Sequence, residues 1–199
     1  MAEVRTIAVI GAGMMGRSIA HLTAIGGYRT ILEDLLPNAL RRAESELRTS
    51  LDQAVESGSV SSDAADNAFS RLEFAGSVEG AAREADLVIE SVPEELESKI
   101  EIFTLLDKIC RPDTIIVANI SELSITEIAS VTYRARKCLG MRFPGPLDRA
   151  RRLEIIRGME TDDETLAAAV KVGGRMGMEV AVNNEALAEV VIPGRAGAK

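Results

Sequence analysis

Three glycines and one aspartate near the start of the chain have the types and spacing needed to bind a dinucleotide. Gly11, Gly13 and Gly16 form a G-x-G-x-x-G loop between a short apolar run and a helical pattern, and a second apolar run ends at Asp34. The first glycine permits a tight turn, the second lets the backbone approach a pyrophosphate, and the third lets the helix pack closely on the strand. The order of strand, loop, helix, strand and acid predicts a dinucleotide site more strongly than the glycines alone.

The acid at the end of the second apolar run predicts which dinucleotide binds. The Asp34 carboxylate can accept hydrogen bonds from both hydroxyls of the adenosine ribose and would repel a 2′-phosphate, which favours NAD over NADP. Glu33 is a less favoured ribose ligand, because alternation along a strand directs it to the opposite face of the sheet. Met14 and Met15, inside the glycine loop, are assigned to the cofactor site with the glycines.

The other side chains able to perform catalysis or bind metal do not form a recognisable group. His21 is the single histidine, and its spacing in the predicted first helix suits packing against the sheet rather than chemistry. Cys110 and Cys138 lack the spacing of metal ligands, so we expect buried thiols in a reducing compartment. The sequence predicts no metal site.

Alternating strands and helices must position these residues. Strands are predicted at 7–10, 30–32, 73–75, 87–90, 114–118, 138–141, 153–156 and 179–182. Helices between them indicate an α/β fold with a doubly wound, Rossmann-type parallel sheet. Residues 37–72 predict an inserted helical hairpin, with Pro37 in its first turn and Ser61 as the N-cap of its second helix.

Two capping boxes and one domain boundary are also predicted. Ser124 and Thr161 each begin a capping box, and the helix after Thr161 is expected to fade at the Gly173–Gly174 pair. We expect one NAD-binding domain over residues 1–184 and a short tail over residues 185–199.

The composition limits the classes of partner. The 199-residue chain has a net charge of −8 and a pI near 4.9, which argues against a nucleic acid or an anionic membrane as the main partner. No apolar run approaches the roughly 18 residues of a membrane span, and no secretory signal is recognisable. The expected location is the cytoplasm.

These motifs together resemble the N-terminal NAD-binding domain of the 3-hydroxyacyl-CoA dehydrogenases. The resemblance covers about residues 5–158 and rests on GAGMMG, ADLVIESVPEELESK and CRPDTIIVANISELSIT. It implies NAD-dependent interconversion of 3-hydroxyacyl and 3-ketoacyl thioesters, with the hairpin helping to hold coenzyme A. It also implies that Glu94 and Lys99 lie along the cofactor, and that Asn119 and Ser121 face the nicotinamide and the substrate oxygen.

The catalytic turn departs from the family pattern. The family has a histidine in a G-x-H-F-F-N-P turn and a glutamate twelve residues later. Here Arg142 replaces the histidine, Gly145 replaces the asparagine of the turn, and Glu154 matches the glutamate. Arginine cannot act as the base, and loss of a general base typically costs about 10²–10⁴ in rate. Arg142 could still polarise a carbonyl or clamp a carboxylate, with its charge offset by Glu154.

The C-terminal sequence also differs from the pattern of the family. Family members continue into an all-helical domain that closes the acyl pocket and forms the dimer, opened by a D-x-P-G-F-x-x-N-R segment. Residues 182–194 do not match this segment, so we expect the helical dimerisation domain to be absent. Another chain or a second copy would then supply half of the substrate pocket. The apolar residues of 185–192 predict either a homodimer or a short helix folded back on the sheet.

Basic residues near the altered turn have two interpretations. Arg149, Arg151 and Arg152, with Arg134, Arg136 and Lys137 upstream, would form a patch suited to coenzyme A phosphates or an anionic carrier protein. The alternative is scattered surface charge.

Three functions remain open at this point. The first is an NAD-dependent oxidoreductase for acyl thioesters or a related anionic hydroxyacyl substrate, with Ser121, Arg142 and Glu154 as its catalytic group. The second is a non-catalytic NAD-binding relative that acts as a sensor, partner subunit or scaffold. Arg142 and the C-terminal sequence, which differs from the family pattern, favour this second function. The third is another NAD oxidoreductase class, such as a 2-hydroxy-acid or β-hydroxyacid enzyme.

Overall fold

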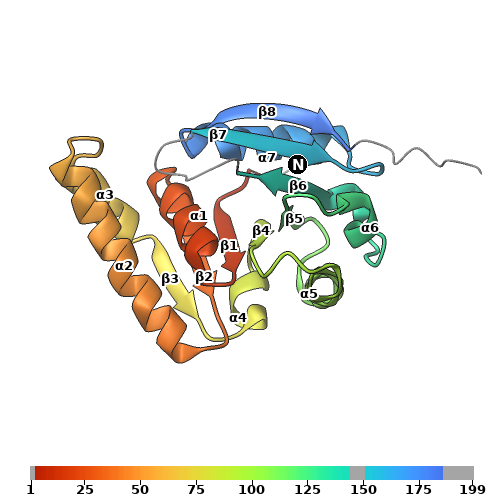
Figure 1. Cartoon of the computed structure of the whole chain (residues 1–199), viewed down its shortest axis with the longest axis horizontal. Coiled ribbons are helices and arrows are strands. Elements are labelled where there is room, and N and C mark those ends of the chain that lie inside the picture. The colour runs from red at the N-terminus through yellow and green to blue at the C-terminus, as the bar shows by residue number, and fades with distance from the viewer. Residues whose placement is uncertain (1–2, 144–150, 186–199) are drawn as a thin grey trace, which may run out of the picture.

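The computed structural model describes residues 3–143 and 151–185 of the chain. The strands of the described part are β1 Thr6–Ile10, β2 Arg29–Glu33, β3 Leu72–Ala75, β4 Leu87–Glu90, β5 Ile115–Asn119, β6 Cys138–Arg142, β7 Arg152–Arg157 and β8 Glu179–Asn184. They form one sheet in the order β3-β2-β1-β4-β5-β6-β7-β8 (Figure 1). The predicted Rossmann-type α/β fold is confirmed.

One strand pair differs from the predicted parallel sheet. β7 runs antiparallel to β6, whereas every other neighbouring pair of the sheet is parallel. The physical reason is length, because residues 143–151 are fewer than the dozen or so that a parallel crossover needs. The antiparallel return brings the start of β7 to the edge of the sheet where β6 ends.

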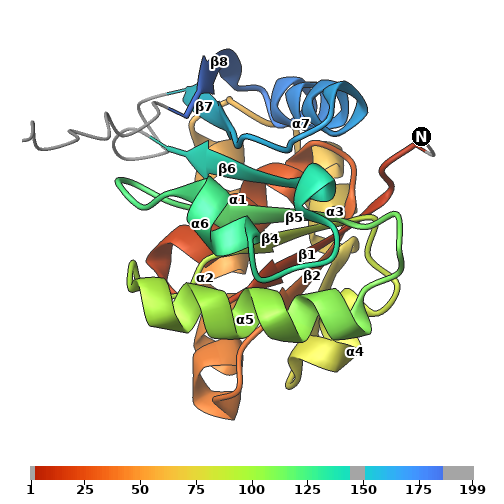
Figure 2. The same cartoon turned by 90° about the vertical axis from the view of Figure 1, so that its right-hand side faces the viewer.

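Helices cover both faces of the sheet. They are α1 Met14–Ile25, α2 Pro37–Glu56, α3 Ser62–Phe69, α4 Val78–Ala82, α5 Leu96–Ile109, α6 Ile125–Ala129 and α7 Asp163–Arg175, with a 3-10 turn at Ala135–Lys137. Side chains of α1, α2, α3 and α7 pack with one set of strand residues, and those of α4, α5 and α6 pack with the other set. Figure 2 shows the arrangement of these helices around the sheet. The two faces therefore have separate apolar cores, as a doubly wound sheet requires.

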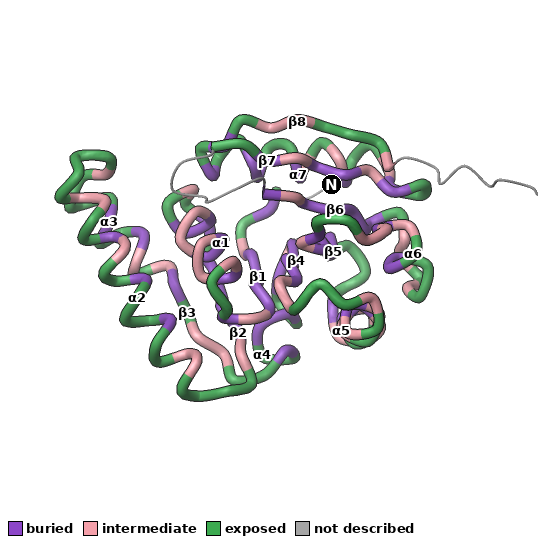
Figure 3. Tube along the Cα trace, in the orientation of Figure 1, coloured by how far each residue is buried: buried purple, intermediate pink, exposed green. Residues whose placement is uncertain are grey.

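The predicted hairpin is present as α2 and α3. Ala43, Leu47 and Leu51 recur every four residues and are buried, while the outer side of α2 is exposed (Figure 3). Pro37 occupies the first turn of α2, and the Ser61 hydroxyl accepts the hydrogen bond that caps α3. The hairpin ends earlier than predicted, because Leu72 already belongs to β3.

Two predicted details of α7 are wrong. The N-cap is Asp162, because the Thr161 hydroxyl is buried and donates to the carbonyl of Cys138. The helix also continues through Gly173 and Gly174 to Arg175. A Cβ at Gly173 would lie 2.7 Å from Leu153 and 2.8 Å from Val180, so glycine lets the helix pack closely on β7 and β8 rather than ending it.

No helix in the described residues is both long and apolar enough to span a membrane.

Candidate functional site

The glycine loop connects β1 to α1 and depends on glycine at two of its three positions. Gly11 has a φ of +100°, and a Cβ there would lie 2.9 Å from the carbonyl oxygen of Ser91. A Cβ at Gly16 would lie only 1.8 Å from the carbonyl oxygen of Gly11, whereas a Cβ at Gly13 would meet no atom within 4 Å. Glycine at positions 11 and 16 therefore allows the loop to fold tightly, and there is open space beside Gly13.

The N-terminus of α1 points its backbone donors into the same region. Gly13 is the N-cap of this helix, and no side chain caps it. Met14 is largely exposed at the first turn, while Met15 packs against the core. Free N–H groups and the positive end of the helix dipole suit an anionic phosphate, so the loop fits the pyrophosphate of a dinucleotide.

Asp34 follows β2 and is tied to the glycine loop. Its carboxylate accepts hydrogen bonds from the backbone N–H of Ala12 at 3.1 Å and of Leu36 at 2.9 Å. The predicted ribose ligand is thus held beside the predicted phosphate loop, at the carboxyl ends of two adjacent strands.

We expect the Asp34 charge to set the preference between cofactors. Wild-type protein should bind NADH more tightly than NADPH, and Asp34→Asn should reduce this preference about tenfold, a change of about 1.4 kcal/mol. The Ala12 and Leu36 amides donate to different carboxylate oxygens, so asparagine keeps an acceptor for one of them and loses the other together with the charge. Calorimetric titration of both cofactors checks this, and equal affinities in the wild type would contradict the assignment.

Glu33 is the last residue of β2 and is 2% exposed. Its Oε1 is buried without a hydrogen-bond partner. Burial, and secondarily the nearby charge of Asp34, raises the pKa of this carboxyl to about 7. The protonated form is therefore the form that the folded protein stabilises.

We expect Glu33 to make stability depend on pH. Its ordinary pKa is 4.5 and its folded pKa is about 7, so its stabilising contribution is complete below pH 4.5 and is lost as the pH rises through 7. Glu33→Gln should therefore be more stable than wild type at pH 8, by up to about 3 kcal/mol, because one pKa unit corresponds to about 1.4 kcal/mol. Urea unfolding at pH 5 and pH 8 measures this. Glu73→Gln, on the exposed pair with Arg29, is the control, and an unchanged pH dependence in Glu33→Gln would refute the expectation.

Asn119 and Ser121, the residues expected to face the nicotinamide, lie at the end of β5 and just after it. The Glu94 carboxylate, from the connection between β4 and α5, binds the backbone of this segment. Oε1 of Glu94 accepts hydrogen bonds from the backbone N–H of Ser121 at 2.6 Å, Glu122 at 3.0 Å and Leu123 at 3.4 Å. Partial burial opposes ionisation, but these three N–H groups hold the pKa of Glu94 below its ordinary value. The structure therefore brings Glu94 and Ser121 together.

Lys99 lies in α5 and is fully buried, rather than on a solvated helix face. Its ammonium forms an ion pair with Glu90, also fully buried, and donates to the backbone carbonyl of Asn119. Sequence reasoning missed Glu90, which was seen only as the end of a strand. The available signal was a charged residue at the end of an otherwise apolar buried strand.

Arg142 and Glu154 face each other across β6 and β7. They are register partners, with 3.5 Å between Nη1 of Arg142 and Oε2 of Glu154. Arg152 lies 3.4 Å from the other carboxylate oxygen, so two guanidinium groups share one carboxylate. The Nε of Arg142 is buried without a hydrogen-bond partner. Gly145 lies outside the described residues.

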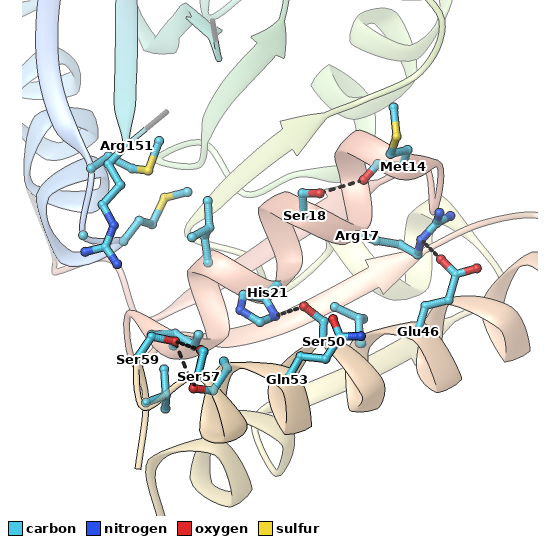
Figure 4. Close-up of a pocket in the computed structure, with 18 of the residues that line it drawn as sticks. Met14, Arg17, Ser18, His21, Glu46, Ser50, Gln53, Ser57, Ser59 and Arg151 are labelled. Carbon is cyan, nitrogen blue, oxygen red and sulfur yellow. Dashed lines mark hydrogen bonds and ion pairs between the residues drawn. The ribbon is translucent and has the colours of Figure 1, made fainter. Parts of the chain in front are cut away.

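A cavity of about 740 Å³ lies between α1, α2 and the ends of β7 and α7 (Figure 4). Ser50 and His21 form a hydrogen bond of 3.2 Å in its wall, and burial lowers the pKa of His21. Arg151 lies across the cavity from α2 in Figure 4. The sequence did not predict that His21 lines a cavity, because its helical spacing only indicated which residues share its face.

The predicted basic patch is not a single surface. Arg134 pairs with Asp107, and Arg136 and Lys137 both pair with Asp162. These residues precede β6, whereas Arg152 lies at the edge where β6 ends. Arg149 lies outside the described residues. In the described part these basic residues are therefore scattered rather than gathered in one patch, and Arg134 and Lys137 are poorly exposed.

Both cysteines are buried, as predicted. Burial raises the pKa of Cys110 to about 11 and that of Cys138 to about 12. Neither thiol forms a thiolate readily at neutral pH, so neither is a candidate nucleophile.

Comparisons with known proteins agree with this geometry. The family model described as "3-hydroxyacyl-CoA dehydrogenase, NAD binding domain" matches residues 6–186. A probable 3-hydroxybutyryl-CoA dehydrogenase of Bacillus subtilis is 35% identical over 175 residues, which cover 88% of this chain and 61% of that protein. A 3-hydroxybutyryl-CoA dehydrogenase of Bradyrhizobium diazoefficiens is 33% identical over 190 residues, covering 96% of this chain and 64% of the relative.

Solved structures show the same likeness. The crystal structure of (S)-3-hydroxybutyryl-CoA dehydrogenase PaaH1 from Ralstonia eutropha superposes with a TM-score of 0.88 at 29% identity, covering 92% of this chain and 65% of that one. The 3-hydroxybutyryl-CoA dehydrogenase of Escherichia coli gives a TM-score of 0.87 at 30% identity, covering 92% and 39%. The chain thus spans less than two thirds of the length of these relatives.

Proposed function

Because the chain belongs to the 3-hydroxyacyl-CoA dehydrogenase family through its NAD-binding domain, we propose that it serves the NAD-dependent interconversion of a 3-hydroxyacyl and a 3-ketoacyl thioester. This proposal rests on the position of the candidate residues at one edge of the sheet. The glycine loop, Asp34 and Asn119 lie at the ends of β1, β2 and β5, and the Arg142–Glu154 pair lies where β6 ends beside β7. Ligands of open α/β sheets bind at this edge.

The cofactor site that we propose extends across this edge. Gly11, Gly13 and Gly16, with Met14 and Met15, would hold the pyrophosphate, and Asp34 would hold the adenosine ribose. Glu94 and Asn119 complete the proposed set on the β4 and β5 side, and Lys99 belongs to it through its bond to the carbonyl of Asn119. When bound, NAD supplies the hydride acceptor for oxidation of the hydroxyl group. The open space beside Gly13 and the uncapped N-terminus of α1 fit this group.

We place the thioester carrier, coenzyme A or a carrier protein, in the cavity between α1 and α2. Its volume and its Ser50 and His21 lining suit a flexible chain with amide groups. The proposed catalytic group is Ser121, Arg142 and Glu154. Arg142 stabilises negative charge on the substrate oxygen, Ser121 donates a hydrogen bond, and Glu154 orients the guanidinium. The cationic pair of Arg142 and Arg152 also suits a related anionic hydroxyacyl substrate.

One observation favours a second function. By resemblance of the turn, Arg142 matches the position of the family's catalytic base, and an arginine cannot accept a proton. A catalytically impaired NAD-binding relative, acting as a sensor, partner subunit or scaffold, is therefore the alternative.

Two assays separate these functions. NADH fluorescence titration measures cofactor binding, and NADH absorbance measures reduction of acetoacetyl-CoA by the protein alone and with added C-terminal domains of homologues. Turnover in either mixture supports the oxidoreductase. Tight NADH binding without turnover in both supports the second function, and absence of NADH binding would refute both.

Three finer proposals accompany this function. The NAD-binding domain occupies residues 1–184 with a tail over 185–199, the protein forms a homodimer, and it works in the cytoplasm. The proposed dimer contacts at residues 186–192 lie outside the described residues. Sedimentation that shows a monomer at high concentration would contradict the dimer.

A further inference from the structure

The buried ammonium of Lys99 has no hydrogen-bond donor left for a ligand. An ammonium group has three donors. In Lys99 they contact Oε1 of Glu90 at 2.9 Å, Oε2 of Glu90 at 2.8 Å and the carbonyl oxygen of Asn119 at 2.8 Å. Both charged side chains are 0% exposed. The same Glu90 carboxylate also accepts from the N–H of Val92, which ties it to the loop after β4.

The segment 119–123 is therefore held from two sides by opposite charges. Lys99 binds its first carbonyl, and Glu94 binds the N–H groups of Ser121, Glu122 and Leu123. Lys99 in turn depends on Glu90, because Glu90 is the carboxylate in direct contact with its buried ammonium. Glu90 therefore helps to hold the start of 119–123 through Lys99, while Glu94 holds the amides that follow.

We propose that Glu90 is a positioning residue, which acts through Lys99 to hold Asn119 and Ser121 in place for the nicotinamide half of the cofactor. The inference rests on the proposed function for the identity of the cofactor. In the proposed site the phosphates would lie over β1 and the adenosine over β2, so the other half of the dinucleotide would extend over β4 and β5, the strands that carry this network.

The effect of the Glu90–Lys99 pair on the position of Asn119 can be measured separately from its effect on the stability of the fold. A buried ion pair is a weak source of stability, and replacing both partners by uncharged groups of similar shape is often neutral. Loss of one partner leaves an uncompensated charge and destabilises the fold. Removing both charges should therefore leave the fold intact and release only the Asn119 carbonyl.

The test uses the double variant Glu90→Gln/Lys99→Met, in which glutamine keeps an oxygen for the Val92 N–H. Its matched control is Asp107→Asn/Arg134→Gln, which removes another poorly exposed ion pair at the far end of the same helix. Each protein is titrated with NADH and with ADP-ribose, which lacks the nicotinamide. Hydrogen exchange is measured at the amides of 120–123, and thermal unfolding reports the fold.

We expect the double variant to unfold near the wild-type temperature, to exchange the 120–123 amides faster, and to lose NADH affinity about tenfold, since small misplacements at a binding site have large effects. Its ADP-ribose affinity should stay within about twofold of wild type, and the control should keep both affinities. Equal losses of NADH and ADP-ribose affinity, or unchanged exchange at 120–123, would overturn the proposal.

A wild-type protein that binds neither ligand would refute the proposed function. The exchange measurement would then still decide whether Glu90 and Lys99 hold the segment. If the double variant does not fold, Glu90→Asp is examined by the same exchange measurement, because its shorter side chain keeps the charge beside Lys99 and weakens only the contact. Exchange at 120–123 as slow as in the wild type would overturn the proposal.

Discussion

Gly16→Ala is expected to abolish dinucleotide binding and to destabilise the fold by about 3 kcal/mol or more, the upper range for overpacking a tight site. The added Cβ would lie 1.8 Å from the carbonyl oxygen of Gly11, and this neighbour is backbone that cannot rotate away. Either α1 moves from the sheet or the loop opens, and each change removes the phosphate site. We expect an NADH affinity at least about 100-fold weaker by fluorescence titration, and a lower midpoint of urea unfolding.

Gly13→Ala and Gly174→Ala are the matched controls for this prediction. A Cβ at either position meets no atom within 4 Å. Gly13→Ala should fold like the wild type and still lose NADH affinity, because its Cβ occupies the space assigned to the pyrophosphate. Gly174→Ala, inside α7, should keep NADH affinity and gain up to about 1 kcal/mol of stability. Wild-type NADH affinity in Gly16→Ala would show that the loop is not the cofactor site.

Oxidation of 3-hydroxybutyryl-CoA by the wild type should be very slow, and Arg142→His should raise it only in part. A permanently protonated guanidinium cannot accept the hydroxyl proton, whereas a histidine beside Glu154 could. The gain should stay below the roughly 10²–10⁴ that a general base can supply, because by the resemblance Gly145 would still stand in place of the asparagine of the family turn. NADH absorbance with 3-hydroxybutyryl-CoA measures the rate.

The reverse reaction and a neutral substitution make this prediction specific. Reduction of acetoacetyl-CoA should be less affected by Arg142, because a cation stabilises a developing alkoxide. Arg142→Gln removes the charge without supplying a base, so it should not gain oxidation activity and should lose reduction activity. Brisk wild-type oxidation that Arg142→His leaves unchanged or lowers would show that the base assignment is wrong.

Local patterns in the sequence were sufficient for the strand–loop–helix unit that presents the glycines. The close contact at Gly16 and the positive φ of Gly11 arise within a few residues of each glycine, whereas the contact of Gly11 with the carbonyl of Ser91 depends on the tertiary structure. Alternation along the strand likewise predicts Asp34 rather than Glu33 as the ribose ligand, since it depends only on the strand period. The buried side of α2 follows from a four-residue spacing. The identity of the family came from motif resemblance and was confirmed by the family model.

Only the tertiary structure decided which charged groups meet. A helical pattern places Lys99 on a face of α5 but does not show that Glu90 and the Asn119 carbonyl lie there, because these groups come from two other segments. The same holds for Glu94 on the amides of 121–123 and for His21 in a cavity wall. The cap of α7 moved from Thr161 to Asp162 because the carbonyl of Cys138, distant in sequence, bound the threonine hydroxyl. Periodicity reports the direction of a side chain relative to its own element, whereas its partner depends on how separate elements pack.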